Sequence, residues 1–222
     1  MSNLRISGRA PIKMVEAYWE GLRNGRLMPN RGEVQARGLG AAMDNAFILE
    51  RVANGFARLR VAGPRLNDLL GMETRGMPIS ALFQQDEAAS LSDILETIFG
   101  EPATAQLTLK SPATSDSPEL IGEMVLLPLR SDLGDVTRAL GCIVYDGQIS
   151  TPPRRFSIVS EHRQTLTGFA EAPENASFVP RRVDAERAQE FAEPAASFET
   201  QAPRPRRAGE RPHLRLVKSD DT

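Results

Sequence analysis

The sequence is poor in the residues that build disulfides, zinc sites and haem ligation. Its 222 residues include one cysteine, Cys142, and two histidines, His162 and His213. A single cysteine excludes a disulfide within the chain and a zinc site made of cysteines. No apolar run approaches the roughly 20 residues that span a bilayer, and the N-terminus leads into no signal-peptide core. These absences predict a cytoplasmic protein without a membrane span.

An excess of charge of either sign is also missing. The chain carries 27 Lys and Arg against 29 Asp and Glu, and residues 1–150 carry 15 basic and 18 acidic side chains. Such a domain lacks the basic surface that grips a phosphate backbone, so we expect no specific nucleic-acid binding. The sequence also has no phosphate-binding loop, no nucleophile and base in a plausible context and no cluster of metal ligands. It therefore predicts a non-enzymatic protein without a metal site.

Residues 151–222 differ in composition from the rest. They hold 12 basic and 11 acidic residues and 8 of the 16 prolines. Such a segment buries too little apolar surface to offset its ordering entropy, so we expect a mostly disordered tail. Residues 156–159 suit a short strand or helix, and residues 213–217, with Leu214 and Leu216 alternating, suit a linear motif that adds to a sheet edge. Four isolated phenylalanines are either docking points for a partner or spacers: Phe169, Phe178, Phe191 and Phe198.

The rest of the chain alternates between helical and strand patterns. Apolar residues at three- and four-residue steps predict an amphipathic helix over residues 12–27. Two strands follow, joined by Asn54-Gly55, which is a strong hairpin signal. Short helices, a longer helix over residues 86–99 and three further strands complete the order, which predicts an α+β domain with its helices on one face of an antiparallel sheet. The strands are predicted at residues 46–52, 56–61, 104–110, 123–130 and 138–145.

Four groups of local motifs occur in the same order as these elements. They are Tyr18-Trp-Glu-Gly-Leu-Arg-Asn-Gly-Arg26 with Pro29 and Arg31, Arg58-Leu-Arg-Val-Ala-Gly63, Leu69-Leu-Gly-Met-Glu73 with Gly76, and Pro128-Leu129. Over residues 12–150 the chain thereby resembles small alphaproteobacterial PAS-domain proteins, which are regarded as regulatory. The resemblance implies a PAS fold with a five-stranded antiparallel sheet. Residues 1–40 are then an N-terminal helical extension, residues 41–150 the PAS domain and residues 151–222 the tail.

The PAS strand order is second, first, fifth, fourth, third, which places residues 56–61 and 104–110 at the sheet edges. The three central strands are apolar on both faces, yet the inserted helices cover only one face. An uncovered apolar face is abnormal for a monomer. We expect the N-terminal helix to cover it, either in its own chain or in a partner chain, and we predict a homodimer. The covering stripe is Val15, Tyr18, Trp19 and Leu22.

A PAS pocket lies between the inner sheet face and the short helices. The candidates to line it are Leu59, Val61, Leu69, Leu82, Phe83, Ile94, Leu107, Leu109, Val125, Leu127 and Ile143. The same residues equally suit a filled core, because core and pocket share an apolar composition. Haem is disfavoured because both histidines fall outside the predicted domain. Covalent flavin is disfavoured because Cys142 sits in the last strand, away from the helical side, and no other cofactor is predicted.

Two functions remain open on the sequence. The first is a PAS sensor or adaptor with no output domain attached. It would bind a small molecule or a regulatory protein partner and pass its state on through dimer or tail contacts. The second is a scaffold dimer whose pocket is filled by its own side chains.

Overall fold

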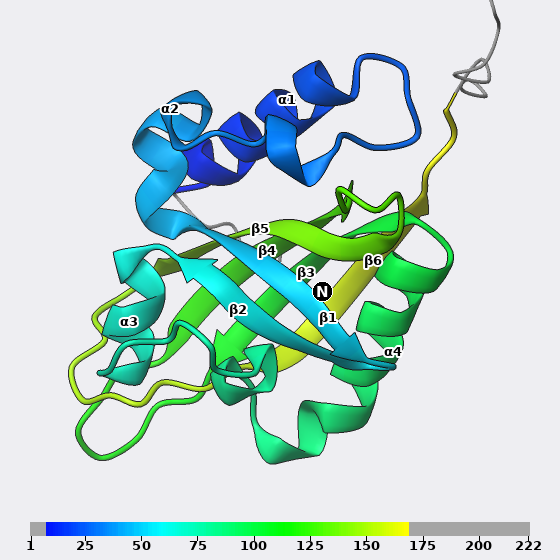
Figure 1. The fold of residues 1–222 in the computed structure, drawn as a ribbon. Helices are drawn as coiled ribbons and strands as arrows, with labels where there is room; N and C mark the ends of the chain where they lie inside the picture. The colour runs from blue at the N-terminus through cyan, green and yellow to red at the C-terminus, as the bar shows by residue number, and fades with distance from the viewer. Residues whose placement is uncertain (1–7, 169–222) are drawn as a thin grey trace, which may run out of the picture. The chain divides into compact units, whose positions relative to one another are not determined.

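The computed structural model describes residues 8–168. The four isolated phenylalanines from Phe169 to Phe198 and the motif at residues 213–217 lie outside the described residues. The described part forms an antiparallel sheet of six strands in the order β2-β1-β5-β4-β3-β6 (Figure 1). The strands are β1 (Ala46–Ala53), β2 (Phe56–Ala62), β3 (Ala103–Ser111), β4 (Leu120–Arg130), β5 (Val136–Asp146) and β6 (Ser157–Thr165).

The predicted order of the first five strands is confirmed, but the count of five is wrong. β6 pairs with β3 from Ala103 opposite Thr165 to Lys110 opposite Ser157. β3 is therefore not an edge strand, and the sheet continues past residue 150. β6 begins within residues 156–159, where a short strand or helix is predicted, but after Ile158 and Val159 its residues are polar on both faces. An edge strand needs little burial, so it shows no hydrophobic alternation to identify it.

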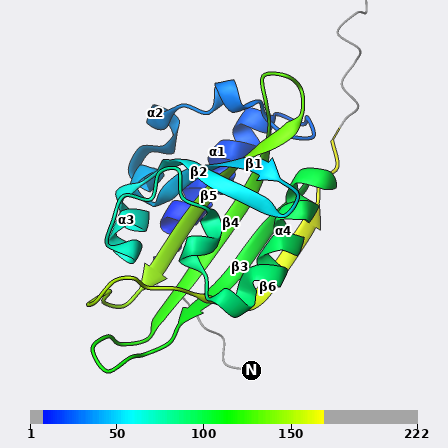
Figure 2. The same cartoon turned by 60° about the horizontal axis from the view of Figure 1, so that its bottom comes forward.

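Helices cover both faces of the sheet (Figures 1 and 2). α1 (Ala10–Arg23) and α2 (Ala36–Leu39) lie on one side, and α3 (Pro64–Leu70) and α4 (Ala88–Gly100) on the other. The predicted N-terminal helix and the long helix before β3 are confirmed. α2 is too short for a periodic pattern and was not predicted. Short 3-10 turns connect the elements: η1 (Arg31–Glu33), η2 (Gly40–Asn45), η3 (Ile79–Leu82) and η4 (Gln85–Glu87).

The β1–β2 hairpin turns at the predicted Asn54-Gly55. Ala53 and Phe56 are the last paired residues, and Gly55 has a φ of 64°. A positive φ is easy for glycine and costly for residues with a Cβ, so the sequence fixes the turn at this position.

α1 packs on the sheet of its own chain. Ile12, Val15 and Trp19 are buried, and the indole Nε1 of Trp19 donates a hydrogen bond of 2.9 Å to the Pro128 carbonyl. The helix thus covers the apolar face that the sequence left uncovered, and that face no longer requires a second chain. The homodimer stays a prediction. The sheet residues of this outer cluster are Ala46, Ile48, Val125, Leu127, Leu129, Leu140, Cys142 and Val144.

The other two residues of the predicted stripe lie at its margin. Tyr18 is half-buried, and its hydroxyl accepts a hydrogen bond of 2.9 Å from the backbone N–H of Gln35. It therefore ties the chain that leads into α2 to the side of α1. Leu22 is half-buried and lies outside the outer cluster.

A buried arginine, Arg154, binds the loop between β3 and β4. Arg154 is 3% exposed, and its guanidinium donates to the carbonyls of Pro118 at 2.7 Å, Pro112 at 3.2 Å and Ile149 at 3.2 Å and to Ser111 Oγ at 3.2 Å. Burial lowers the pKa of Arg154 from its usual value. No carboxylate of residues 8–168 forms an ion pair with Arg154. Its hydrogen bonds, mainly to backbone carbonyl oxygens, therefore offset the free-energy cost of burying its charge.

Replacing Trp19 by Phe should destabilise the protein by about 1–3 kcal/mol, because the buried Pro128 carbonyl then loses its donor. Trp19→Ala should cost about 3–5 kcal/mol, since it also leaves a cavity under α1. The measurement is the free energy of unfolding in urea. Met14→Ala on the exposed side of the same helix should stay within roughly 0.5 kcal/mol. A neutral Trp19→Ala would contradict the docking of α1.

Replacing Arg154 by Met should destabilise the protein by roughly 3 kcal/mol, because several buried carbonyls lose a charged donor at once. Hydrogen exchange of the β6 amides should accelerate with it, since Arg154 anchors the segment that leads into β6. Arg155→Met is the matched control, because Arg155 is exposed. Equal effects of the two variants would remove the structural role given to Arg154.

Candidate functional site

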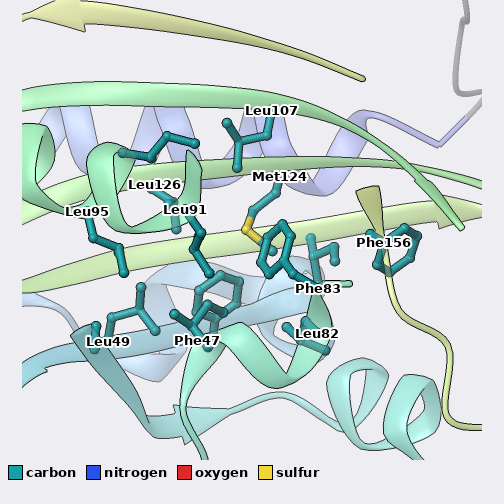
Figure 3. Close-up of a cluster of buried hydrophobic side chains, with 14 of the residues drawn as sticks. Phe47, Leu49, Leu82, Phe83, Leu91, Leu95, Leu107, Met124, Leu126 and Phe156 are labelled. Atoms are coloured by element: carbon teal, nitrogen blue, oxygen red, sulfur yellow. The ribbon is translucent and has the colours of Figure 1, made fainter. Parts of the chain in front are cut away.

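The space between the inner sheet face and α3 and α4 is filled by apolar side chains (Figure 3). This inner cluster contains eight of the eleven pocket candidates, and each of them is at most 3% exposed. They come from β2, α3, η3 with the residue after it, α4, β3 and β5, so the fold brings these distant segments together. The eight are Leu59, Leu69, Leu82, Phe83, Ile94, Leu107, Leu109 and Ile143.

Two candidates from β4 lie on the other side of the sheet. Val125 and Leu127 belong to the outer cluster beneath α1, whereas Met124 and Leu126 take the inner positions. Side chains alternate between the two faces along a strand. Because β4 is apolar at all four positions, its sequence does not reveal which parity faces inward.

The third displaced candidate is Val61, which is 51% exposed. Leu49 pairs with Leu59 but the preceding residue Ile48 pairs with Val61, so Arg60 is an extra residue in β2. Such a bulge reverses the alternation of side chains. Val61 therefore shares the side of Ile48 and not that of Leu59.

Phe47 belongs to the inner cluster but is not among the predicted pocket residues. It pairs with Gly141 of β5, and a Cβ placed on Gly141 would lie 2.2 Å from the Phe47 ring. The ring therefore takes the space that a side chain on β5 would need. The available signal was this glycine inside an otherwise apolar strand, since glycine in a strand often marks a close approach.

Phe156 closes one end of the inner cluster and is fully buried. Its backbone N–H donates to the Leu82 carbonyl, and its own carbonyl accepts from the N–H of Gln84, both at 2.9 Å. The sequence predicts this residue in a tail beyond the domain. The chain after β5 instead returns across η3 before it starts β6.

Tyr145 is the polar group at the margin of this core. Its hydroxyl is shielded from solvent and has no well-formed hydrogen bond among residues 8–168. Burial raises the pKa of Tyr145, and the guanidinium of Arg65 on α3 acts against that rise. A ligand group in the core would find its hydrogen-bonding partner here.

The residues considered for cofactors lie elsewhere. Cys142 is buried in the outer cluster beneath α1, and burial raises the pKa of its thiol to about 12. His162 lies on β6 opposite Gln106 and is exposed. Neither side chain contributes to the inner cluster. Among residues 8–168, no group of three His, Cys, Asp or Glu side chains is placed to hold a metal ion.

A carboxylate lies under the start of α1. Glu123 of β4 forms an ion pair with Arg9, and its side chain is 13% exposed. Burial raises the pKa of Glu123, Arg9 lowers it, and the nearby Glu16 raises it further. These charges orient the start of α1.

An open groove lies where η2, the start of β1 and the end of β2 meet. It encloses about 290 Å³, and its wall is apolar apart from Arg31. Met43 and Val61 stand at its opening at 50% and 51% exposed, and Leu39 and Ile48 form its buried floor. Val61 thus lines this groove instead of the predicted pocket.

None of the helices within residues 8–168 is long and apolar enough to cross a membrane.

Comparison with known proteins assigns the family. A family model described as "PAS domain" matches residues 9–144, which is more than half of the chain. No curated protein matches. A solved structure of an RNA-binding light-oxygen-voltage receptor is 17% identical with a TM-score of 0.33, over 65% of this chain and 34% of that one, so the match spans about a third of the receptor. The family match agrees with the strand order and the helical cover, and the chain belongs to the PAS domain family.

Proposed function

We propose that this chain is a non-catalytic regulatory PAS protein that acts through a protein partner and not through a small molecule held in its core. The observation that carries the proposal is the Phe47 ring packed onto Gly141, in the space where a PAS pocket would lie. A ligand there must displace a fully buried ring and the side chains around it. Because protein interiors are close-packed, the core has little room to adapt.

The open surface of the domain favours the same function. The side chains of the groove opening, Met43 and Val61, are half exposed although both are apolar. Exposed apolar surface beside a preformed depression is typical of an interaction site. The protein then recognises its partner through a preformed surface of its own, and the identity of the bound partner determines the regulatory effect. We expect it to do so in the cytoplasm.

A second function, sensing of a small molecule, is favoured by one observation. The Tyr145 hydroxyl is buried without a well-formed hydrogen bond, and a buried polar group in this state costs free energy. A ligand that displaces Phe47 and reaches Tyr145 would satisfy it. The homodimer is compatible with either function.

Phe47→Ala should separate the two functions. In the wild type, indole and benzene should leave the melting temperature unchanged, and native mass spectrometry should show the chain without an adduct. In Phe47→Ala the stability should fall by about 3–5 kcal/mol, and both ligands should raise the melting temperature by filling the new cavity. Phe47→Leu, with a smaller cavity, serves if Phe47→Ala does not fold.

The outcome against the proposal is a small molecule that co-purifies with the wild type. Tyr145→Phe then tells the two readings apart. Loss of that adduct in Tyr145→Phe would establish small-molecule sensing in place of partner binding.

A further inference from the structure

The groove beside η2 is held open by backbone contacts. The N–H of Gly63 donates a hydrogen bond of 2.9 Å to the Ala46 carbonyl, and a Cβ on Gly63 would lie 2.3 Å from the Asp44 carbonyl oxygen. Asn45 Nδ2 also donates a hydrogen bond of 2.8 Å to the Ile143 carbonyl of β5. The end of β2 and the turn η2 are therefore fixed against each other. A preformed site of this kind binds with little loss of conformational entropy.

The surface around the groove is basic. Arg31 lines the groove, and Arg37 is exposed and follows the lining residue Ala36 in the chain. Among residues 8–168, Arg31 and Arg37 form no ion pair.

The opposing charges on the same rim are few. Arg60, beside Val61, is paired with Glu50, and Glu33, beside the lining residue Val34, is paired with Arg26. Asp44 follows the lining residue Met43, and Glu73 lies with Arg75 in a neighbouring depression that shares Val61. The rim thus keeps a net positive charge although the chain as a whole has a net charge of −2. An apolar floor with a positive rim is complementary to a segment that carries apolar anchors flanked by carboxylates.

Addition of a strand is not the way in which such a segment would bind at β2. The outer side of β2 is already in use at its middle, where the N–H of Leu59 donates to the Met77 carbonyl and the N–H of Gly76 donates to the Leu59 carbonyl. The occupant must therefore insert side chains between Met43 and Val61. Large apolar side chains in a desolvated pocket are what usually carry the affinity of such contacts.

We propose that this groove docks an acidic segment of another protein, with one or two large apolar side chains inserted between Met43 and Val61 and carboxylates facing Arg31 and Arg37. The proposal rests on the proposed function, because it names the surface and the partner class of that function. The site differs from the PAS core, because its floor residues Leu39 and Ile48 belong to the outer cluster, although Phe47 and Pro64 also contribute to its wall.

The probe is a random-peptide library selected on the full-length protein, with depletion on full-length Val61→Asp. The surviving peptides should be net acidic and contain large apolar residues. The affinity of an enriched peptide, measured by fluorescence anisotropy, should fall at least about tenfold in Val61→Asp and in Met43→Asp, because each buries a carboxylate in the apolar groove. Arg37→Glu should weaken binding severalfold, with the loss largest at low salt.

Val159→Asp is the matched control, since Val159 on β6 is 49% exposed and Val61 is 51% exposed. The affinity of Val159→Asp for the enriched peptide should equal that of the wild type. All variants should keep the wild-type circular dichroism spectrum. Enrichment of basic peptides, or of peptides that bind Val61→Asp normally, would overturn the proposal.

Two other occupants give distinct results, and either overturns the proposal. If a second copy occupies the groove, the wild type self-associates and Val61→Asp is monomeric. If the chain's own tail occupies it, replacing Phe191 and Phe198 by Ala tightens peptide binding. A ligand found in the core of the wild type would contradict the proposed function but leave the peptide results standing, so the two failures are distinguishable.

Discussion

Two central strands that are apolar on both faces constrain the whole fold. β4 and β5 present Met124, Leu126 and Ile143 to one side and Val125 and Leu127 to the other, and both sides are buried. A sheet of this kind is stable only when helices cover it twice. The helices between β2 and β3 supply one cover, and α1 supplies the other from the same chain. The hydrogen bond from Trp19 to Pro128 fixes how α1 lies on the strands.

Much of the fold was predictable because short stretches of the sequence indicate its turns, helices and strands. The Asn54-Gly55 turn, the stripe of α1 and the order of elements each have a pattern that a single sequence carries. β6 has no such pattern, since its partner β3 supplies all of its pairing and its side chains stay largely exposed. The positions of Val125 and Leu127 depend on the parity of a uniformly apolar strand. The position of Val61 depends on a single extra residue, Arg60, which only the pairing with β1 reveals.

The predicted pocket differs from the observed site because the deciding features again leave no pattern in the sequence. A list of apolar residues describes a filled core and a pocket equally well, and the difference lies in one ring, Phe47, seated on Gly141. The groove depends on Met43, in a short turn without periodicity, and on Val61, whose direction the bulge sets. Neither feature leaves a pattern in the sequence. The inner core then contributes stability, and we propose that partner recognition takes place at the groove beside β1 and β2.

The anchoring of Arg154 has a consequence for how this protein tolerates sequence change. Its guanidinium contacts carbonyl oxygens of Pro112, Pro118 and Ile149, which every residue type would provide. The loop between β3 and β4 can therefore exchange most of its exposed side chains without weakening the anchor, provided its backbone path is kept. Evolutionary drift, or an epitope tag grafted into residues 113–116, should be better tolerated there than a single change at Arg154 itself.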